Sequence, residues 1–163
     1  QPGPGVGGHC IAVDPWFIIS SATEHANLIR VAREVNDSKP RWVSERIYAA
    51  LGNYLVQNSE VTADGVTIAI YGRSFQPETD GLRGSPALEI AKTIAANRPG
   101  EVLAVEPNIT GLPVSGSYGL TLVSLDDALR KADIHVLLVD HKEFKNSRPS
   151  QGQIVDTRGI WRQ

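Results

Sequence analysis

Cysteine, methionine and aromatic residues are scarce in this 163-residue sequence, which has one cysteine, no methionine and 6% aromatic residues. A single cysteine excludes an internal disulfide, and it favours a reducing, cytoplasmic setting. No apolar run approaches the ~20 residues of a membrane-spanning helix. The net charge is −2, without the strongly basic balance that is typical of nucleic-acid-binding proteins. We therefore expect neither a membrane nor a nucleic acid as a partner.

The sequence has no methionine at its start and begins inside the glycine-rich segment QPGPGVGGHC. A natural gene product starts with methionine, often removed later, and rarely starts inside such a segment. We therefore expect the chain to be the C-terminal portion of a longer protein. Its length suits one domain, or one domain with an appended segment.

The first third of the chain has helical periodicity. Asp14 is predicted to be the N-cap of a helix, with Pro15 at its first position. Two apolar stripes follow, and Pro40 between them is expected to kink or split the helical region because it lacks an N–H group. The stripes comprise Leu28, Ile29, Ala32 and Val35, and then Val43, Ile47, Ala50, Leu51 and Leu55. A helical region of this length is typical of a connector or an oligomer interface.

From residue 62 onward, apolar strands alternate with helices. The strands are predicted at VTIAIYG, EVLAVEP, IHVLLVD and QIVDTRG, with a shorter one at TLVSL. Helices are predicted between them, with Ser85 and Ser124 as N-caps. This alternation predicts an α/β fold, in which a helical segment precedes a Rossmann-like, doubly wound and mainly parallel sheet.

The carboxyl ends of the predicted strands mark the place for a ligand, because open parallel sheets bind ligands beyond that edge. Those ends fall at residues 72–75, 106–108, 140–142 and 156–158, which are rich in charged and polar side chains. We expect a small-molecule site at this edge.

The opening residues 3–8 (GPGVGG) match the G-x-G-x-x-G pattern of dinucleotide-binding folds. That interpretation requires a strand before the glycines and a helix opening from them, whereas only Gln1 and Pro2 precede them in this sequence and a cysteine-bearing segment follows. Two alternatives are a loop whose backbone N–H groups approach a ligand closely and a plain flexible loop. The pattern by itself leaves both open.

Cys10 follows this loop, with His9 beside it and a helix start four residues later. A nucleophilic cysteine needs partial exposure and nearby cations, amides or a helix terminus. The residue types alone allow either a reactive or an inert thiol. Asp14 can likewise cap the helix, assist the thiol as a carboxylate, or do both.

Three segments, in this order, resemble the UDP-glucose/GDP-mannose dehydrogenase family: GPGVGGHCIAVDPWF, LIRVAREVND and SFQPETDGLRGSPALEIA. The resemblance implies a catalytic cysteine loop and central dimerisation helix over residues 1–61, and a UDP-sugar-binding α/β domain over residues 62–163. It also implies NAD as cofactor, a UDP-sugar substrate, a homodimer, and an N-terminal NAD-binding domain of the same parent chain as a further partner. The family oxidises a sugar C6 alcohol to a carboxylate in two steps.

The resemblance also implies roles for individual residues. Cys10 corresponds to the nucleophile and Asp14 to the carboxylate that assists it, while Arg83 corresponds to an arginine that contacts NAD. No metal site is implied. The residues that correspond to substrate-binding positions are Gly5, Val6, Gly7, Gly8, Phe75, Gln76 and Arg158.

This sequence departs from the family pattern at four positions. Gln76 replaces a lysine, Glu78 an asparagine, Gly81 an aspartate and Gly84 a glutamate. Alternatives to a dehydrogenase portion are therefore a nucleotide-sugar-binding module without catalysis, a dimerisation unit, or a dehydrogenase for another UDP-hexose. The chain alone is expected to be inactive, because the resemblance places the other catalytic groups and the main NAD-binding fold outside it.

Overall fold

The computed structural model describes residues 3–74, 76–78, 81–107 and 118–161. Its strands form one parallel sheet in the order β3-β2-β1-β4-β5. The strands are β1 (Ile68–Tyr71), β2 (Val102–Val105), β3 (Thr121–Leu122), β4 (Ile134–Leu137) and β5 (Gln153–Asp156). The predicted fold class, a helical segment followed by a Rossmann-like doubly wound sheet, is confirmed.

The chain reverses the direction of sheet growth at β1. From β1 it builds β2 and β3 on one side, and then it crosses over to add β4 and β5 on the other. Ile68 of β1 accordingly pairs with Val102 of β2 and with Ile134 of β4. The topological switch point therefore lies between the carboxyl ends of β1 and β4, where parallel sheets bind ligands.

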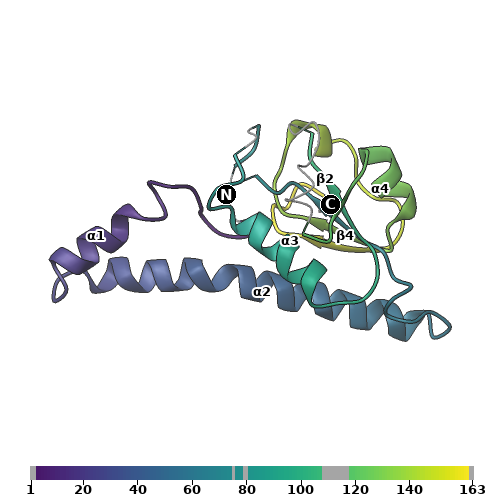
Figure 1. Ribbon diagram of the computed structural model, residues 1–163, viewed down its shortest axis with the longest axis horizontal. Helices are drawn as coiled ribbons and strands as arrows, with labels where there is room; N and C mark the ends of the chain where they lie inside the picture. The colour runs from purple at the N-terminus through teal and green to yellow at the C-terminus, as the bar shows by residue number, and fades with distance from the viewer. Residues whose placement is uncertain (1–2, 75, 79–80, 108–117, 162–163) are drawn as a thin grey trace.

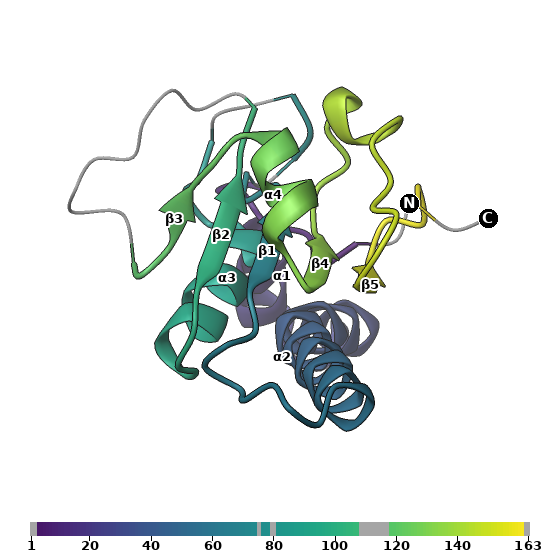
Figure 2. The ribbon, with the colours of Figure 1, turned by 90° about the vertical axis from the view of Figure 1, so that its right-hand side faces the viewer.

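Helices cover both faces of the sheet, as Figure 2 shows. On one face lie α3 (Pro86–Ala96) and the C-terminal half of α2 (Asn27–Gln57); α4 (Leu125–Lys131) and a 3₁₀ turn, η2 (Lys142–Phe144), cover the other. Because successive strand residues point to opposite faces, Ile70 packs against the first layer and Tyr71 against the second. This two-sided burial explains the near-continuous apolar runs in the sequence.

The predicted caps of α3 and α4 are confirmed. The Ser85 hydroxyl accepts the Leu88 N–H at 3.2 Å, and the Ser124 hydroxyl accepts the Asp127 N–H at 3.1 Å. Each bond satisfies a backbone donor that the first helical turn leaves without a partner.

The predicted N-cap of the first helix is wrong. Helix α1 (Asp14–Ser21) begins at Asp14 itself, and its N-cap residue Val13 makes no side-chain cap. The N–H groups of Val13 and Asp14 both donate to the carbonyl of Cys10, at 2.9 and 2.8 Å. The turn therefore closes one residue earlier than the sequence suggested, and Asp14 lies in the first helical turn.

Pro40 does not divide the helical region. Helix α2 runs through it without interruption for 31 residues (Figure 1). The proline removes one backbone hydrogen bond, whereas Val43, Ile47 and Ala50 just beyond it are buried against the sheet. Burial of this apolar stripe holds the second half of α2 in line with the first.

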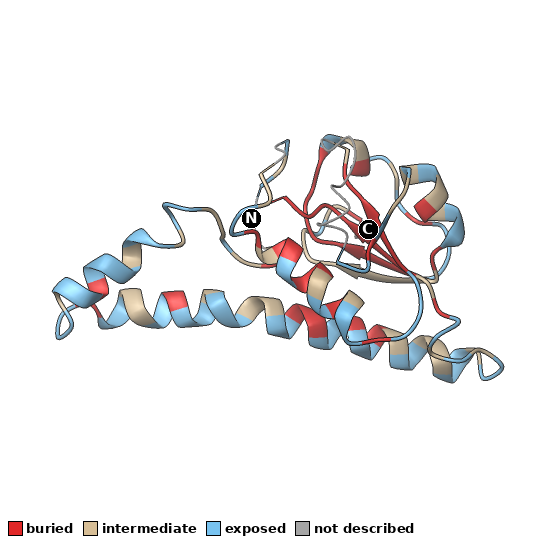
Figure 3. Cartoon of the chain, viewed as in Figure 1, coloured by how far each residue is buried: buried red, intermediate tan, exposed pale blue. Residues whose placement is uncertain are grey.

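The two halves of α2 differ in burial (Figure 3). The C-terminal half packs on the sheet, whereas the N-terminal half extends beyond it beside α1. There the side chain of Leu28 is 82% exposed, and Val31 and Val35 are more than half exposed. Of the first predicted stripe, Leu28, Ala32 and Val35 are thus exposed, and Ile29 is partly buried. No helix in the described part of the chain is long and apolar enough to cross a membrane.

Within the second core layer, His135 is buried, and its Nδ1 lies 2.8 Å from the Tyr71 hydroxyl. Burial lowers the pKa of His135 below its ordinary value of 6.5, since the charged ring would lose its hydration. The unfolded chain therefore binds more protons than the folded chain below that pH.

We expect the free energy of unfolding to fall as the pH drops below 6.5, the ordinary pKa of histidine. Urea unfolding at about pH 7.5 and about pH 5.5 measures this loss. His135→Gln should reduce the difference between the two pH values, whereas His25→Gln, at an exposed position, should not. An equal pH dependence in all three proteins would contradict the assignment to His135.

Candidate functional site

The glycine-rich segment of residues 3–8 packs on the loop between β1 and α3, beside the carboxyl end of the sheet. The Gly8 N–H donates to the Gly84 carbonyl at 3.1 Å, and the Val6 N–H donates to the side-chain oxygen of Asn36 at 2.7 Å. Among the hydrogen bonds of the described residues, none uses the N–H groups of Gly5 and Gly7. These two groups are therefore among the backbone donors that the loop can offer to a ligand.

Two glycines of this segment are required by the chain's own packing. A Cβ on Gly7 would overlap the Gly84 carbonyl oxygen and lie 2.5 Å from Cδ of Pro86. A Cβ on Gly3 would lie 2.5 Å from Nη1 of Arg158. Both contacts are far shorter than van der Waals separation, so only glycine fits without a shift of its neighbours.

The G-x-G-x-x-G pattern here does not form a dinucleotide-binding turn. Residues 3–13 contain no strand, and the first strand of the described chain is β1, which begins at Ile68. The helix that follows the glycines, α1, begins only at Asp14, so the described residues do not show the strand-turn-helix geometry on which that motif depends.

A crevice of about 230 Å³ lies between this loop and the carboxyl edge of the sheet. It brings together residues from the loop, from the ends of β1 and β4, and from the segment after β5. The predicted substrate-binding residues among its lining are Gly5, Val6, Gly7, Gln76 and Arg158. Gly8, also predicted to bind substrate, does not line the crevice, and Phe75 lies outside the described residues.

Arg158 is held in place by two acidic side chains. Its Nη2 lies 2.6 Å from Oδ1 of Asp140 in a mostly buried ion pair. Its backbone N–H donates to the Asp156 carboxylate at 2.8 Å, which also accepts N–H groups of Gly159 and Trp161. A guanidinium fixed in this way suits paired binding of phosphate or carboxylate oxygens.

A buried polar cluster joins the ends of β1, β2 and β4. Nδ1 of His141 accepts the Glu78 N–H at 3.1 Å, and Nε2 of the same ring lies 2.9 Å from Oε1 of Glu106. Oε2 of Glu106 in turn accepts the Arg73 N–H at 2.6 Å. Since Nδ1 is an acceptor, the neutral ring carries its proton on Nε2. We did not predict this cluster; the strand-end rule indicated where its members lie, but not their pairing.

Arg73 adds a buried cation to this edge of the sheet. Its guanidinium makes no hydrogen bond within the described part of the chain, although the residue is fully buried. Burial lowers the pKa of Arg73, and the nearby Glu106 carboxylate opposes that change. The site therefore has positive charge at Arg73 and Arg158, while Gln76 at the expected lysine position is neutral.

Cys10, Asp14 and Arg83 do not line the crevice. All three are exposed at the surface of the chain. Ile11, directly after the cysteine, does line it. The structure therefore places the three predicted catalytic and cofactor-binding residues outside the crevice, with Cys10 directly next to one of its lining residues.

Glu78, one of the four departures from the family pattern, links two loops of the site. Its carboxylate accepts the Lys142 N–H at 2.9 Å and lies 3.2 Å from Nζ of the same lysine. These contacts lower the pKa of Glu78. Glu78, His141 and Glu143 have ligand atoms within 4.8 Å of one another. Because His141 Nδ1 accepts an N–H and Lys142 faces Glu78, this group is arranged as a hydrogen-bond network and does not fit a cation.

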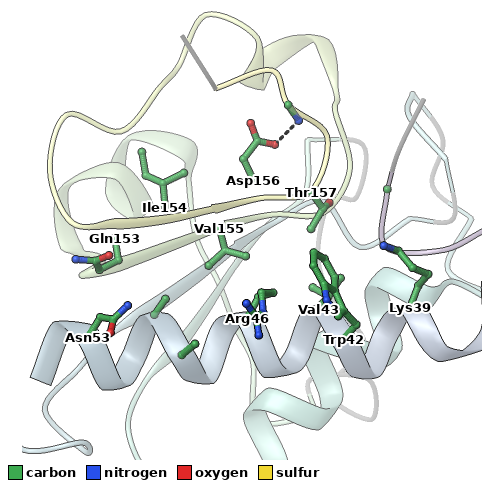
Figure 4. Close-up of a pocket in the computed structure, with 14 residues that line it drawn as sticks. Lys39, Trp42, Val43, Arg46, Asn53, Gln153, Ile154, Val155, Asp156 and Thr157 are labelled. Atoms are coloured by element: carbon green, nitrogen blue, oxygen red, sulfur yellow. Dashed lines mark hydrogen bonds between the residues drawn. The ribbon is translucent and has the colours of Figure 1, made fainter.

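A second cavity, of about 450 Å³, lies between α2 and β5 (Figure 4). Lys39, Trp42 and Arg46 line it from the helix, opposite Asp156 and Thr157. Asp156 and Thr157 belong to a predicted strand end, whereas none of the described site residues predicted from the family resemblance lines this cavity.

The fold and the crevice define a doubly wound, parallel α/β domain with a crevice at the carboxyl edge of its sheet, which the loop of residues 3–8 covers. Two family models match the chain: the UDP binding domain of the UDP-glucose/GDP-mannose dehydrogenase family over residues 69–163, and the central domain of the same family over residues 1–38. The chain belongs to the UDP-glucose/GDP-mannose dehydrogenase family.

The chain is similar to three proteins in particular. It is 52% identical to a UDP-N-acetyl-D-mannosamine dehydrogenase of Salmonella typhi, over 99% of this chain and 39% of that protein. It is 48% identical to an NDP-N-acetyl-D-galactosaminuronic acid dehydrogenase of Ralstonia solanacearum, over 99% of this chain and 36% of the relative. A solved UDP-D-ManNAc dehydrogenase structure from Pyrococcus horikoshii matches with a TM-score of 0.77 and 32% identity, over 98% of this chain and 36% of that one. The chain thus spans well under half the length of these relatives.

Gly7→Ala is expected to lower the free energy of unfolding by about 1–3 kcal/mol, because the added methyl group overlaps the β1–α3 loop. Gly52→Ala is the matched control, since a Cβ there meets nothing within 4 Å. In that exposed helical position alanine should raise stability by up to about 1 kcal/mol. Urea unfolding measures both changes. Equal stability of Gly7→Ala and the unaltered chain would show that the loop does not pack as described.

Proposed function

We propose that this chain is the C-terminal part of an NAD-dependent UDP-N-acetyl-D-mannosamine 6-dehydrogenase that serves surface polysaccharide biosynthesis. The similarity to dehydrogenases of N-acetylated nucleotide sugars supports the substrate class. The observation that carries the proposal is the crevice, which joins the cysteine-bearing loop to Arg158 at the switch point of the sheet.

In this proposal the crevice binds the UDP-sugar. Arg158, fixed by Asp140, pairs with phosphate oxygens, and the N–H groups of Gly5 and Gly7 donate to the same ligand. Gln76 lines the crevice as a neutral hydrogen-bonding group where the family pattern has a cation. Val6 and Gly8 contribute to the loop's position, since their N–H groups are used within the chain.

Cys10 supplies the covalent chemistry of the second oxidation step. Its thiolate adds to the carbonyl carbon of the aldehyde formed from the C6 alcohol, giving a thiohemiacetal. Loss of a hydride and a proton converts this adduct to a thioester, and water then hydrolyses the thioester to the carboxylate and the free thiol. Asp14 lies four residues away in the first turn of α1, where a carboxylate can order the attacking water. The exposure of Cys10 suits a nucleophile that meets groups from outside this chain.

Bound NAD+ would supply the hydride acceptor for each oxidation step. Within this chain Arg83 is the residue that fits a contact with its phosphates, because it is an exposed cation on the β1–α3 loop. The glycine-rich segment lacks the geometry of a dinucleotide fold, so the main NAD-binding groups are proposed to lie in an N-terminal domain of the parent chain. The 163-residue chain is therefore expected to be inactive alone.

We also propose that the parent protein is a cytoplasmic homodimer. The exposed apolar residues Leu28, Val31 and Val35 on the N-terminal half of α2 support a helix-mediated interface. The proposed division is a cysteine loop and dimerisation helix over residues 1–61, and a UDP-sugar-binding domain over residues 62–163. Exposed Cys10, as the single thiol, suits a reducing compartment.

Cys10→Ser in the full-length protein is expected to reduce formation of the uronic acid from UDP-N-acetylmannosamine by about a thousandfold or more, because serine replaces the thiolate nucleophile of the second oxidation step. The aldehyde should then accumulate in place of the uronic acid. Ser20→Ala, on the exposed side of α1, is the control and should keep full activity. NADH absorbance and mass spectrometry of the products measure the outcome. Unchanged turnover of Cys10→Ser would remove the thioester mechanism.

The second candidate is a nucleotide-sugar-binding module without catalysis, which the neutral Gln76 favours. Calorimetry of the 163-residue chain with UDP tests the binding role shared by both candidates. Arg158→Ala should weaken UDP binding about 10–100-fold through loss of charge-assisted hydrogen bonds. Arg158→Lys should weaken UDP binding less than Arg158→Ala. Arg41→Ala, at an exposed position on α2, is the control and should leave the affinity for UDP unchanged. If the chain binds UDP but the full-length protein reduces no NAD+ with any UDP-hexose, the module is the correct function.

A further inference from the structure

One side chain of α2 binds the backbone of the glycine-rich loop at two points. The Val6 N–H donates to Oδ1 of Asn36 at 2.7 Å, and Nδ2 of Asn36 donates to the Val6 carbonyl at 3.2 Å. The two residues are 30 positions apart in the sequence. A carboxamide that both donates to and accepts from one residue fixes the position and the direction of the backbone there. Val6 lies four residues before Cys10.

The amide of Asn36 is itself held in one orientation. Its Nδ2 lies 3.2 Å from Oδ1 of Asp37, a carboxylate that can only accept. The same Oδ1 is 2.6 Å from Nη2 of Arg33, which is nine-tenths buried in α2. Since Nδ2 must face Asp37, Oδ1 of Asn36 is turned to the Val6 N–H. Three residues on one side of α2 thus form a chain of contacts that ends on the loop.

Pro40 affects the same turn of the helix. It lies four residues after Asn36 and has no N–H, so the Asn36 carbonyl lacks its usual helical donor. Gly5 of the loop passes beside this carbonyl: a Cβ on Gly5 would lie 3.6 Å from it and 3.3 Å from Cβ of Pro86. The loop therefore packs on the turn of α2 at which the hydrogen-bond series is interrupted.

We propose that Asn36 is a positioning residue, which holds the loop before Cys10 in the geometry that the cysteine needs for reaction. The expected effect of Asn36 on turnover rests on the proposed function, whereas the effect of Asn36 on the loop does not. Asn36 touches neither the thiol nor the crevice ligand in this proposal; it acts through Val6.

The test uses three variants. Asn36→Ala removes both hydrogen bonds to Val6. Asn36→Asp keeps the acceptor for the Val6 N–H and loses the donor to its carbonyl. Ser38→Ala is the matched control, because the Ser38 hydroxyl is exposed and donates only to the Val35 carbonyl of its own helix.

Hydrogen exchange of the Val6 amide, measured in the 163-residue chain, reports on the loop directly. We expect Asn36→Ala to accelerate it about tenfold or more, and Ser38→Ala to have no effect. Asn36→Asp should also accelerate it, because a carboxylate oxygen would then face the Val6 carbonyl and Asp37. Exchange of core amides in β1 and β4 should stay unchanged in all variants. Equal exchange of Val6 in Asn36→Ala and the unaltered chain would overturn the proposal. If Asn36→Ala fails to fold, Asn36→Asp carries the same comparison.

Steady-state kinetics of the full-length protein supply the catalytic readout. A displaced nucleophile should lower kcat by about a hundredfold in Asn36→Ala, while KM for the UDP-sugar changes by less than about threefold. Equal falls in the kcat of Asn36→Ala and Ser38→Ala would overturn the positioning role. If the unaltered protein oxidises no UDP-hexose while Val6 exchange still responds to Asn36→Ala, the proposed function fails and the role of Asn36 in holding the loop is supported.

Discussion

The packing of α2 on the sheet is the contact on which the other features of the site depend. Val43, Ile47 and Ala50 are buried against residues from both strands at the switch point. This contact fixes the helix relative to the carboxyl ends of β1 and β4, and so fixes where Asn36 meets the glycine-rich loop. Apolar burial thus aligns polar groups that are far apart in the sequence, since a fully buried Val or Ile side chain contributes about 1.5–3 kcal/mol to stability.

The glycines of the opening segment combine two roles. At Gly3 and Gly7 the absence of a side chain permits contact with Arg158 and with the β1–α3 loop. At Gly5 and Gly7 the backbone N–H groups stay available beside the crevice. Because these glycines have no side chains, the backbone of the segment can lie directly against the domain and also approach a ligand in the crevice. Its match to a dinucleotide motif reflects this packing and does not reflect a strand-turn-helix unit.

The charged side chains at the carboxyl edge of the sheet lie in contact with groups of opposite charge or with hydrogen-bond donors. Asp140 fixes Arg158, Glu106 lies between Arg73 and His141, and Glu78 joins Lys142 across two loops. The contacts of Asp140 and Glu106 replace hydration that these groups lose on burial, whereas Glu78 and Lys142 are exposed. The departures at positions 76 and 78 therefore change different properties: the first removes a cation from the crevice lining, while the second connects the loops after β1 and β4.

The sequence by itself determined the α/β class, the strands and the caps at Ser85 and Ser124, because these follow from local periodicity and side chains three residues from their backbone partners. It also indicated the carboxyl ends of the strands as the ligand edge. Tertiary structure alone decided that α2 continues through Pro40, that Gly84 receives the loop, and that Asn36 binds Val6. Those outcomes depend on contacts between segments tens of residues apart, and no local pattern encodes the relative placement that burial of the α2 stripe imposes.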